Sequence, residues 1–144
     1  AADRAEHFKK VIAPALRDNK IVICDRYVES SIAYQSAEGL DEKWIEEINV
    51  CVPRPDLTII LDVYPSVALN RIENRVKTLG VSKEKFERIR FLRRVRSIYR
   101  KRAEEQKYVM IDATPPIKIV QESIRKIVWE KLSLKQAKNN PSNR

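Results

Sequence analysis

The amino-acid sequence predicts an α/β fold in which a parallel sheet carries helices on both faces. Three short apolar runs, at residues 20–24, 57–63 and 108–111, have the length and composition of strands that are buried on both sides. Segments with apolar residues at helical spacing alternate with these runs along the chain. Alternating strands and helices are typical of parallel sheets that helices cover on both faces.

The first half of the chain is predicted to form a helix, a strand and two further helices. Residues 2–18 carry apolar side chains at helical spacing, and Pro14 should kink this helix or restart it. After the strand at 20–24, residues 29–37 have the pattern of a short helix. A turn then leads into a helix over residues 41–52, which two closely spaced prolines end.

The second half of the chain is predicted to contain the other two strands and three more helices. Residues 65–76 should form a helix that follows the second strand directly, because its proline fits the first helical position. Apolar side chains repeat along a long helix over residues 86–99. After the third strand, Thr114 should cap the final helix.

The composition favours anionic partners. The 144 residues include 29 Lys and Arg against 20 Asp and Glu, which gives a net charge of +9. Such a charge suits nucleotides, nucleic acid or anionic lipid without choosing among them. No apolar run of membrane-spanning length occurs in the sequence, so we expect no membrane span. Cys24 and Cys51 are interpreted as small buried apolar groups in a reducing compartment.

The most informative candidates are Asp25 and Arg26, which directly follow the first predicted strand. Ligands bind at the carboxyl ends of parallel strands in open α/β sheets. A carboxylate there can hold the water shell of a magnesium ion, and a guanidinium can form a fork of hydrogen bonds to a phosphate. The alternative is that Asp25 caps the next helix and forms a surface ion pair with Arg26.

A group of polar side chains follows on the short helix at 29–37. Ser30 and Tyr34 are four residues apart and share a helical face, and Ser31 is also a neighbour of Tyr34. Together with Gln35, these side chains could read the edge of a base and a sugar hydroxyl. The alternative interpretation is an ordinary polar helix surface.

A basic segment surrounds Gly80. It contains Arg71, Arg75, Lys77, Lys83, Lys85 and Arg88. A basic loop between two helices can close over phosphates and exclude water. The alternative is a charged face that is simply solvated.

Taken in order, four motifs make the sequence resemble the thymidylate kinase family. They are Ala-Ala-Asp-Arg-Ala-Glu-His at 1–7, Asp-Arg-Tyr-Val-Glu-Ser-Ser-Ile-Ala-Tyr-Gln at 25–35, Arg-Pro-Asp-Leu-Thr-Ile-Ile-Leu-Asp-Val at 54–63 and Ile-Asp-Ala at 111–113. The resemblance implies a P-loop NTPase-like α/β fold. It also implies transfer of the terminal phosphoryl group of ATP to dTMP, giving dTDP and ADP, with Mg²⁺ as cofactor.

The resemblance further implies how the acceptor nucleotide would be held. Arg4 would reach the thymine carbonyl, while Ser30 and Ser31 would approach the thymine edge directly or through water. Tyr34 would pack against the deoxyribose and disfavour a 2′-hydroxyl, with Gln35 beside it.

The catalytic pair and the ATP side also follow from the resemblance. Arg26 would hold the acceptor phosphate, and Asp25 would orient the magnesium water shell or the reacting phosphates. Arg71 would lie against the adenine, and a basic lid at about 75–88 would close on the ATP phosphates. The remaining residues that this likeness assigns to ATP are Arg75, Lys83, Lys85, Asp112 and Thr114. A cytoplasmic homodimer that binds dTMP and ATP, and not nucleic acid, is the expected assembly.

One departure from the family pattern is plain. The family's phosphate-binding loop, Gly-x-x-x-x-Gly-Lys-Ser/Thr, does not occur in the chain, which contains only Gly39 and Gly80. We therefore expect residues 1–135 to be a partial thymidylate kinase domain without its N-terminal strands, inactive alone, followed by a frayed polar tail at 136–144. The alternative function is that of a non-catalytic, basic remnant that binds nucleotides or nucleic acid.

Overall fold

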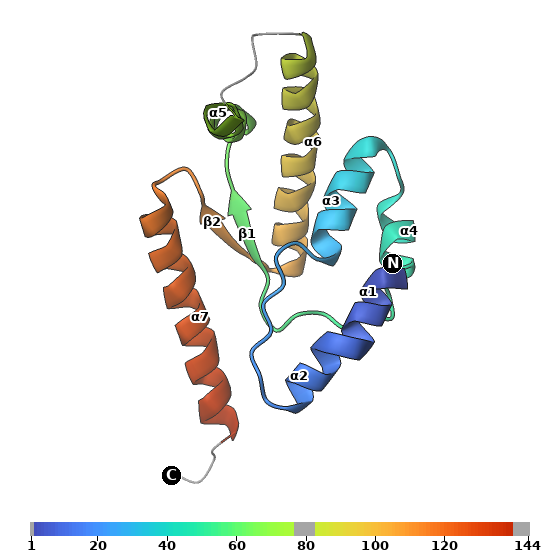
Figure 1. Ribbon diagram of the computed structural model, residues 1–144, viewed down its shortest axis with the longest axis vertical. Coiled ribbons are helices and arrows are strands. Elements are labelled where there is room, and N and C mark those ends of the chain that lie inside the picture. Colours follow the sequence, from blue (N-terminus) through green and yellow to red (C-terminus); the bar gives the residue numbers. More distant parts are fainter. Residues whose placement is uncertain (1, 77–82, 140–144) are drawn as a thin grey trace.

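The computed structural model describes residues 2–76 and 83–139, with the side chains at 73–76, 83–86 and 135–139 left out. Figure 1 shows two central strands with long helices on either side. The elements are α1 (Ala2–His7), the π-helix η1 (Phe8–Ile12), α2 (Ala13–Arg17), α3 (Val28–Glu38), α4 (Glu42–Glu47), β1 (Ile59–Asp62), α5 (Pro65–Val76), α6 (Lys83–Gln106), β2 (Val109–Asp112) and α7 (Ile117–Asn139).

The two strands form a parallel sheet. Ile59 pairs with Val109 at one end of the sheet and Asp62 pairs with Asp112 at the other. Helix α6 contacts β1 and helix α7 contacts β2, and the strands lie between these two helices (Figure 1). The predicted α/β fold, a parallel sheet with helices on both faces, is therefore confirmed.

Helix α3 packs along α6 and forms the clearest apolar core of the structure. Ala33 and Ala37 of α3 are buried against Val95 of α6, and Tyr34 and Phe91 pack around them. Small alanine side chains let the two helices approach closely, so that the polar residues at the start of α3 are fixed relative to α6.

The first predicted helix changes its hydrogen-bond pattern next to Pro14. Ala13 donates its backbone N–H to the carbonyl of Phe8, five residues earlier, which is the bonding pattern of a π-helix. Pro14 has no N–H to donate, and α2 begins beside it. The helix changes its hydrogen-bond pattern just before Pro14 and continues through it, as one run of helical residues from Ala2 to Arg17, so the predicted kink or restart stays a prediction.

The predicted strand at residues 20–24 is wrong. This segment has no strand structure, and the side chains of Ile21 and Ile23 are 67% and 88% exposed. Among the described residues β1 and β2 pair only with each other, so the segment has no ladder partner for its backbone groups. Apolar composition alone does not form a strand without a neighbouring strand. The prediction that Cys24 and Cys51 are buried is also wrong, because both are exposed.

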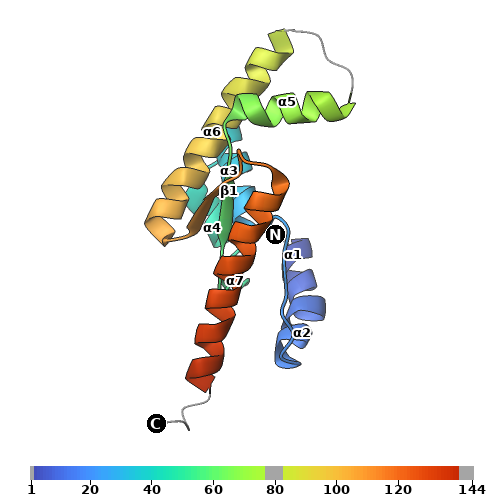
Figure 2. The same ribbon diagram turned by 90° about the vertical axis from the view of Figure 1, so that its left-hand side faces the viewer.

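The last helix runs well past the sheet. Its N-terminal half packs near β2, where Val120 is buried, and its C-terminal half extends away from the strands (Figures 1 and 2). It continues to Asn139, so residues 136–139 are helical, and residues 140–144 lie outside the described part of the chain. None of the helices in the described ranges is both long enough and apolar enough to cross a membrane.

Candidate functional site

Asp25 and Arg26 lie in the turn that leads into α3, and both side chains are exposed. Arg26 has a φ of +61°, in the left-handed region that only a small fraction of residues other than glycine adopts. Its Nε donates a hydrogen bond of 2.8 Å to the Oγ of Ser30, and its guanidinium lies 4.5 Å above the ring of Tyr34. Non-glycine residues in this conformation cluster at ligand sites, where the surrounding structure offsets the strain.

The hydrogen bond from Arg26 to Ser30 does not use the two terminal nitrogens of the guanidinium. It uses Nε, whereas the terminal Nη atoms are not part of this bond. A guanidinium with accessible terminal nitrogens can still engage a phosphate. The predicted neighbourhood of Arg26, Ser30 and Tyr34 is thus present as geometry.

Tyr34 sits on an aromatic base that α6 provides. Its ring meets the ring of Phe91 edge to face, with the centroids 6.0 Å apart. Tyr99 also comes from α6, and burial raises the pKa of its hydroxyl. Gln35 follows Tyr34 on α3 and is half-buried. One face of the Tyr34 ring is therefore covered by Arg26 and its edge is held by α6.

A second constellation joins three helical regions that are distant in sequence. Arg4 of α1 donates to the Oγ of Ser31 on α3 at 2.6 Å and to the Oδ1 of Asn49, which follows α4. The Nδ2 of Asn49 in turn donates to the carbonyl of Ile45 at 2.7 Å, which fixes the orientation of the amide. The predicted proximity of Arg4 and Ser31 is therefore present, and both are held in place.

Asn49 is a site residue that the sequence reasoning missed. It is only 5% exposed, and it lies within the apolar stripe formed by Ile45, Ile48 and Val52. A polar residue beside such a stripe needs a buried hydrogen-bond partner, and that requirement is the signal that could have identified it.

Tyr27 is a second residue that was missed. The guanidinium of Arg4 lies 5.4 Å from the centre of its ring. Its hydroxyl is buried and has no hydrogen-bond partner among the described residues, and burial raises its pKa. A buried hydroxyl without a hydrogen-bond partner costs about 1–3 kcal/mol.

The residues predicted for the ATP side also converge. The Nη1 and Nη2 of Arg71 donate to the carbonyls of Ala113 and Thr114, both at 2.7 Å. The Oδ1 of Asp112 accepts the N–H of Thr114 at 2.8 Å. Hydrogen bonds from Thr114 lower the pKa of Asp112. The side chains of Arg75, Lys83 and Lys85, and the whole of residues 77–82, lie outside the described part of the chain.

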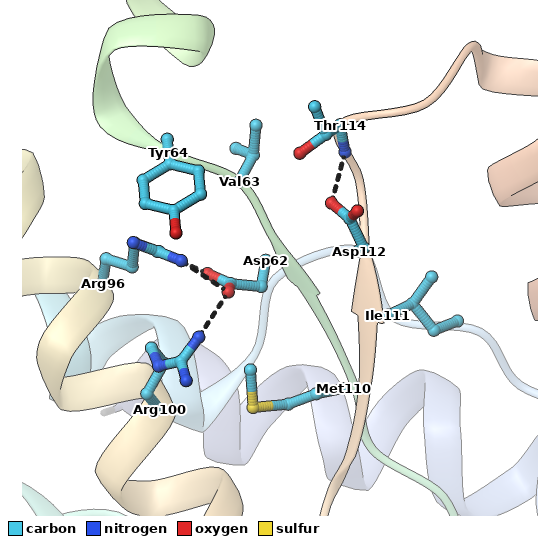
Figure 3. Close-up of a pocket in the computed structure, with 9 residues that line it drawn as sticks. All are labelled: Asp62, Val63, Tyr64, Arg96, Arg100, Met110, Ile111, Asp112 and Thr114. Atoms are coloured by element: carbon cyan, nitrogen blue, oxygen red, sulfur yellow. Dashed lines mark hydrogen bonds and ion pairs between the residues drawn. The ribbon is translucent and has the colours of Figure 1, made fainter.

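A cavity of about 280 Å³ opens at the carboxyl ends of β1 and β2 (Figure 3). Its lining residues are Asp62, Val63, Tyr64, Arg96, Arg100, Met110, Ile111, Asp112 and Thr114. This position is where open α/β sheets bind their ligands. The sequence reasoning took Asp62 only as part of a strand, although its place at the strand's end was the available signal.

Asp62 is the anchor of this cavity. It accepts a fork from the Nε and Nη2 of Arg96, at 2.6 and 2.8 Å, and a third bond of 2.8 Å from Arg100. The hydrogen bond from Arg96 is the largest cause that lowers the pKa of Asp62. The guanidinium of Arg96 also lies 4.0 Å from the centre of the Tyr64 ring (Figure 3). Asp62 is thus paired within the cavity with both arginines that line it.

Asp25 is the described carboxylate that the family likeness assigns to magnesium, and its side chain is exposed. In the described part of the chain, no three His, Cys, Asp or Glu residues cluster as metal ligands. Magnesium in phosphoryl-transfer sites keeps several waters and takes one or two carboxylates plus substrate phosphates. The exposed carboxylate of Asp25 suits contact through water.

Comparisons with known proteins point to one family. The family model for thymidylate kinase matches residues 1–124. A probable thymidylate kinase of Pyrobaculum calidifontis is 55% identical over 116 residues, which are 81% of this chain and 58% of that protein. A probable thymidylate kinase of Archaeoglobus fulgidus is 41% identical over 138 residues, covering 95% of this chain and 67% of that protein.

A solved structure has the same fold. The crystal structure of thymidylate kinase from Ehrlichia chaffeensis superposes with a TM-score of 0.66 at 31% identity, and covers 89% of this chain and 60% of that one. The chain thus spans about 60% of that structure and 58% of the Pyrobaculum calidifontis relative.

Proposed function

The chain belongs to the thymidylate kinase family, and on this premise we propose that it forms the acceptor side and part of the donor side of an enzyme that transfers the terminal phosphoryl group of ATP to dTMP. The products are dTDP and ADP. The observation that carries the proposal is the convergence of Arg26 and Ser30 with Arg4 and Ser31 at the start of α3. These contacts bring together groups suited to a phosphate and groups suited to a base.

Each acceptor contact has a physical role. The guanidinium of Arg26 neutralises the phosphate of dTMP and orients it with charge-assisted hydrogen bonds. Arg4 and Ser31 present donors to the thymine edge, with Ser30 and Gln35 nearby. Tyr34 packs against the sugar, where its bulk disfavours a 2′-hydroxyl.

The donor side relies on charge and on main-chain groups. Arg71 lies against the adenine and holds the Asp112–Thr114 loop that borders it. The basic residues at about 75–88 close on the ATP phosphates, and Asp25 orients the water shell of Mg²⁺. Phosphoryl transfer depends mainly on positioning and on neutralised charge, which these groups supply.

The chain contains no phosphate-binding loop of the family pattern, so we propose that residues 1–144 bind nucleotide without efficient phosphoryl transfer. The family's assembly is proposed as a homodimer in the cytoplasm, through the helices near residues 5–18 and 29–52. Exposed apolar side chains at Val11, Leu16 and Trp44 support this surface. Replacing Trp44 with glutamate should shift the mass measured by light scattering toward the monomer, and an unchanged mass would exclude this interface.

Calorimetric titration of the chain with dTMP tests the proposed function. We expect saturable binding that discriminates against UMP and dCMP. Tyr34→Ala should reduce the preference for deoxyribose over ribose. The alternative, a basic remnant that binds nucleic acid, predicts instead oligonucleotide binding that falls steeply with salt and no preference among mononucleotides.

A further inference from the structure

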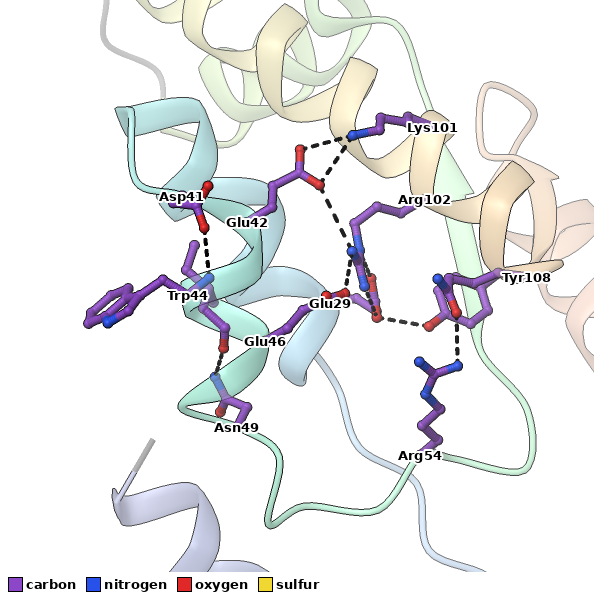
Figure 4. A network of polar contacts seen from close by, with 12 residues as sticks. Glu29, Asp41, Glu42, Trp44, Glu46, Asn49, Arg54, Lys101, Arg102 and Tyr108 are labelled. Carbon is purple, nitrogen blue, oxygen red and sulfur yellow. Dashed lines mark hydrogen bonds and ion pairs between the residues drawn. The ribbon is translucent and has the colours of Figure 1, made fainter.

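Arg102 is the buried centre of a network of charged side chains on α3, α4 and α6 (Figure 4). It belongs to α6 and is 5% exposed. Its Nε and Nη2 form a fork onto the two carboxylate oxygens of Glu29 on α3, at 2.5 and 3.0 Å. Its Nη1 donates to Glu46 of α4 at 2.8 Å. The guanidinium of Arg102 on α6 therefore contacts both α3 and α4.

The network also reaches the sheet. The hydroxyl of Tyr108, which precedes β2, donates to Glu29 at 2.8 Å. Burial and this hydrogen bond to Glu29 raise the pKa of Tyr108 to about 12, so the hydroxyl stays a donor at neutral pH. At the exposed rim, Lys101 contacts Glu42 at 3.4 Å. Glu29 is thus held from α6 and from the entry to β2.

The two carboxylates that Arg102 holds are next to the acceptor contacts. Glu29 directly precedes Ser30 and Ser31, which bind Arg26 and Arg4. Glu46 lies three residues before Asn49, which binds Arg4 and hydrogen-bonds back into α4. Each arm of the guanidinium therefore ends within three residues of a side chain that orients an arginine of the site.

Energetics do not explain the network as a stabilising device alone. Taking the guanidinium of Arg102 and most of the Glu29 side chain out of water is costly, and well-packed apolar residues often stabilise a core as well or better. A forked, three-helix contact does fix relative orientation, because its hydrogen bonds are directional.

From this juxtaposition we propose that Arg102 is a positioning residue for acceptor recognition. Its hydrogen bonds to Glu29 fix the position of the start of α3, and its hydrogen bond to Glu46 fixes the position of the end of α4. The positions of these two helix ends together orient the side chain of Arg4 toward the base in the proposed site. The inference rests on the proposed function, because it concerns the same acceptor site.

The test measures dissociation constants for dTMP and dCMP on the folded chain and three variants. Glu46→Gln removes one charged arm at a carboxylate that is 43% exposed, so the variant should fold. We expect it to reduce the ratio of the dCMP and dTMP dissociation constants by about threefold or more, as loss of one hydrogen bond to a charged group allows. Arg102→Lys keeps the charge without the fork and should reduce the ratio similarly.

The ratio of the dCMP and dTMP dissociation constants distinguishes a change in the position of the site residues from a loss of stability of the whole chain. A smaller folded fraction weakens both nucleotides by the same factor and leaves the ratio unchanged. Glu105→Gln is the matched control, because it makes the same chemical change as Glu46→Gln at an exposed position on the helix that carries Arg102. This variant should keep the wild-type ratio.

Two results would overturn the inference in different ways. If Glu46→Gln and Arg102→Lys both keep the wild-type dTMP affinity and ratio, Arg102 does not position the site and the proposed function stands. If the wild-type chain itself shows no saturable dTMP binding, the proposed function fails and the inference falls with it.

Discussion

The acceptor region and the donor region of the molecule are built in different ways. In the acceptor region, side chains from α1, α3 and α4 hold one another, as Arg4 holds Ser31 and Asn49. In the donor region, Arg71 binds backbone carbonyls of a loop and Asp62 pairs with arginines of α6. Side chains therefore hold one another throughout the first region, whereas the second also depends on main-chain carbonyls that Arg71 binds.

The largest effect should come from the acceptor region, at Arg26. If Arg26 holds the acceptor phosphate as proposed, replacing it with methionine removes charge-assisted hydrogen bonds, each worth about 1.5–3 kcal/mol. We expect the dTMP affinity, measured by calorimetry, to fall about 10- to 100-fold, while binding of thymidine, which has no phosphate, is unchanged. Arg26→Lys should not restore the fork.

A matched control for Arg26 is Arg93→Met, which removes the same charge from an exposed position on α6. This variant should retain the dTMP affinity within about twofold, since screened surface charges contribute little. Equal losses of thymidine and dTMP affinity in Arg26→Met would exclude a direct phosphate contact.

An intermediate effect is expected at Asn49. Asn49→Ala removes an acceptor of Arg4 and leaves that guanidinium with the hydroxyl of Ser31 and the ring of Tyr27. We expect about a fivefold loss of dTMP affinity, near the value of about 1 kcal/mol for one ordinary hydrogen bond. Asn70→Ala, at an exposed position on α5, is the control, and an equal loss there would show that the effect is not local.

The donor region should respond more weakly and separately. Arg71→Met releases the carbonyls of Ala113 and Thr114, which should shift the backbone amide signals of that loop in NMR spectra. Because Arg71 is exposed, we expect only about a threefold loss of ATP affinity and no loss of dTMP affinity. A drop in dTMP affinity would break the separation between the two regions.

The smallest effect concerns the pH dependence of stability at Asp62. Arg96 lowers its pKa below the ordinary value of 3.8, so its stabilisation is complete above pH 3.8 and is lost as the pH falls through the folded-state value. Between pH 5 and pH 2, the Tm of the wild-type chain should fall more steeply than that of Asp62→Asn, by a few degrees, since 1 kcal/mol shifts Tm by about 2–4 °C. Parallel curves would contradict this.

The sequence predicted the parts of the fold that local patterns specify. The strands at 57–63 and 108–111 were found, shortened to Ile59–Asp62 and Val109–Asp112, because each has a partner in the sheet. The strand at 20–24 was predicted from composition and failed, since pairing is a long-range property that a local pattern does not contain.

The site also contains residues that the sequence identified and residues that it did not. The family likeness named Arg4 and Ser31, which do meet. It did not name Asn49 or Arg102, whose partners lie up to 73 residues away in sequence. Pairings over such separations are visible only once the helices are packed.

The π-helix between α1 and α2 has a consequence for how Arg4 reaches its partners. A π turn contains one residue more than the α-helical turn it replaces, and each residue of an α-helix rotates the chain by about 100°. Deleting a single amino acid from Phe8–Ile12 would convert the π-helix into a regular α-helix. The residues of α1 would then be rotated about the helix axis by about that angle. The guanidinium of Arg4 would then face away from Ser31, so the contact between these two residues depends on one additional residue in the π-helix.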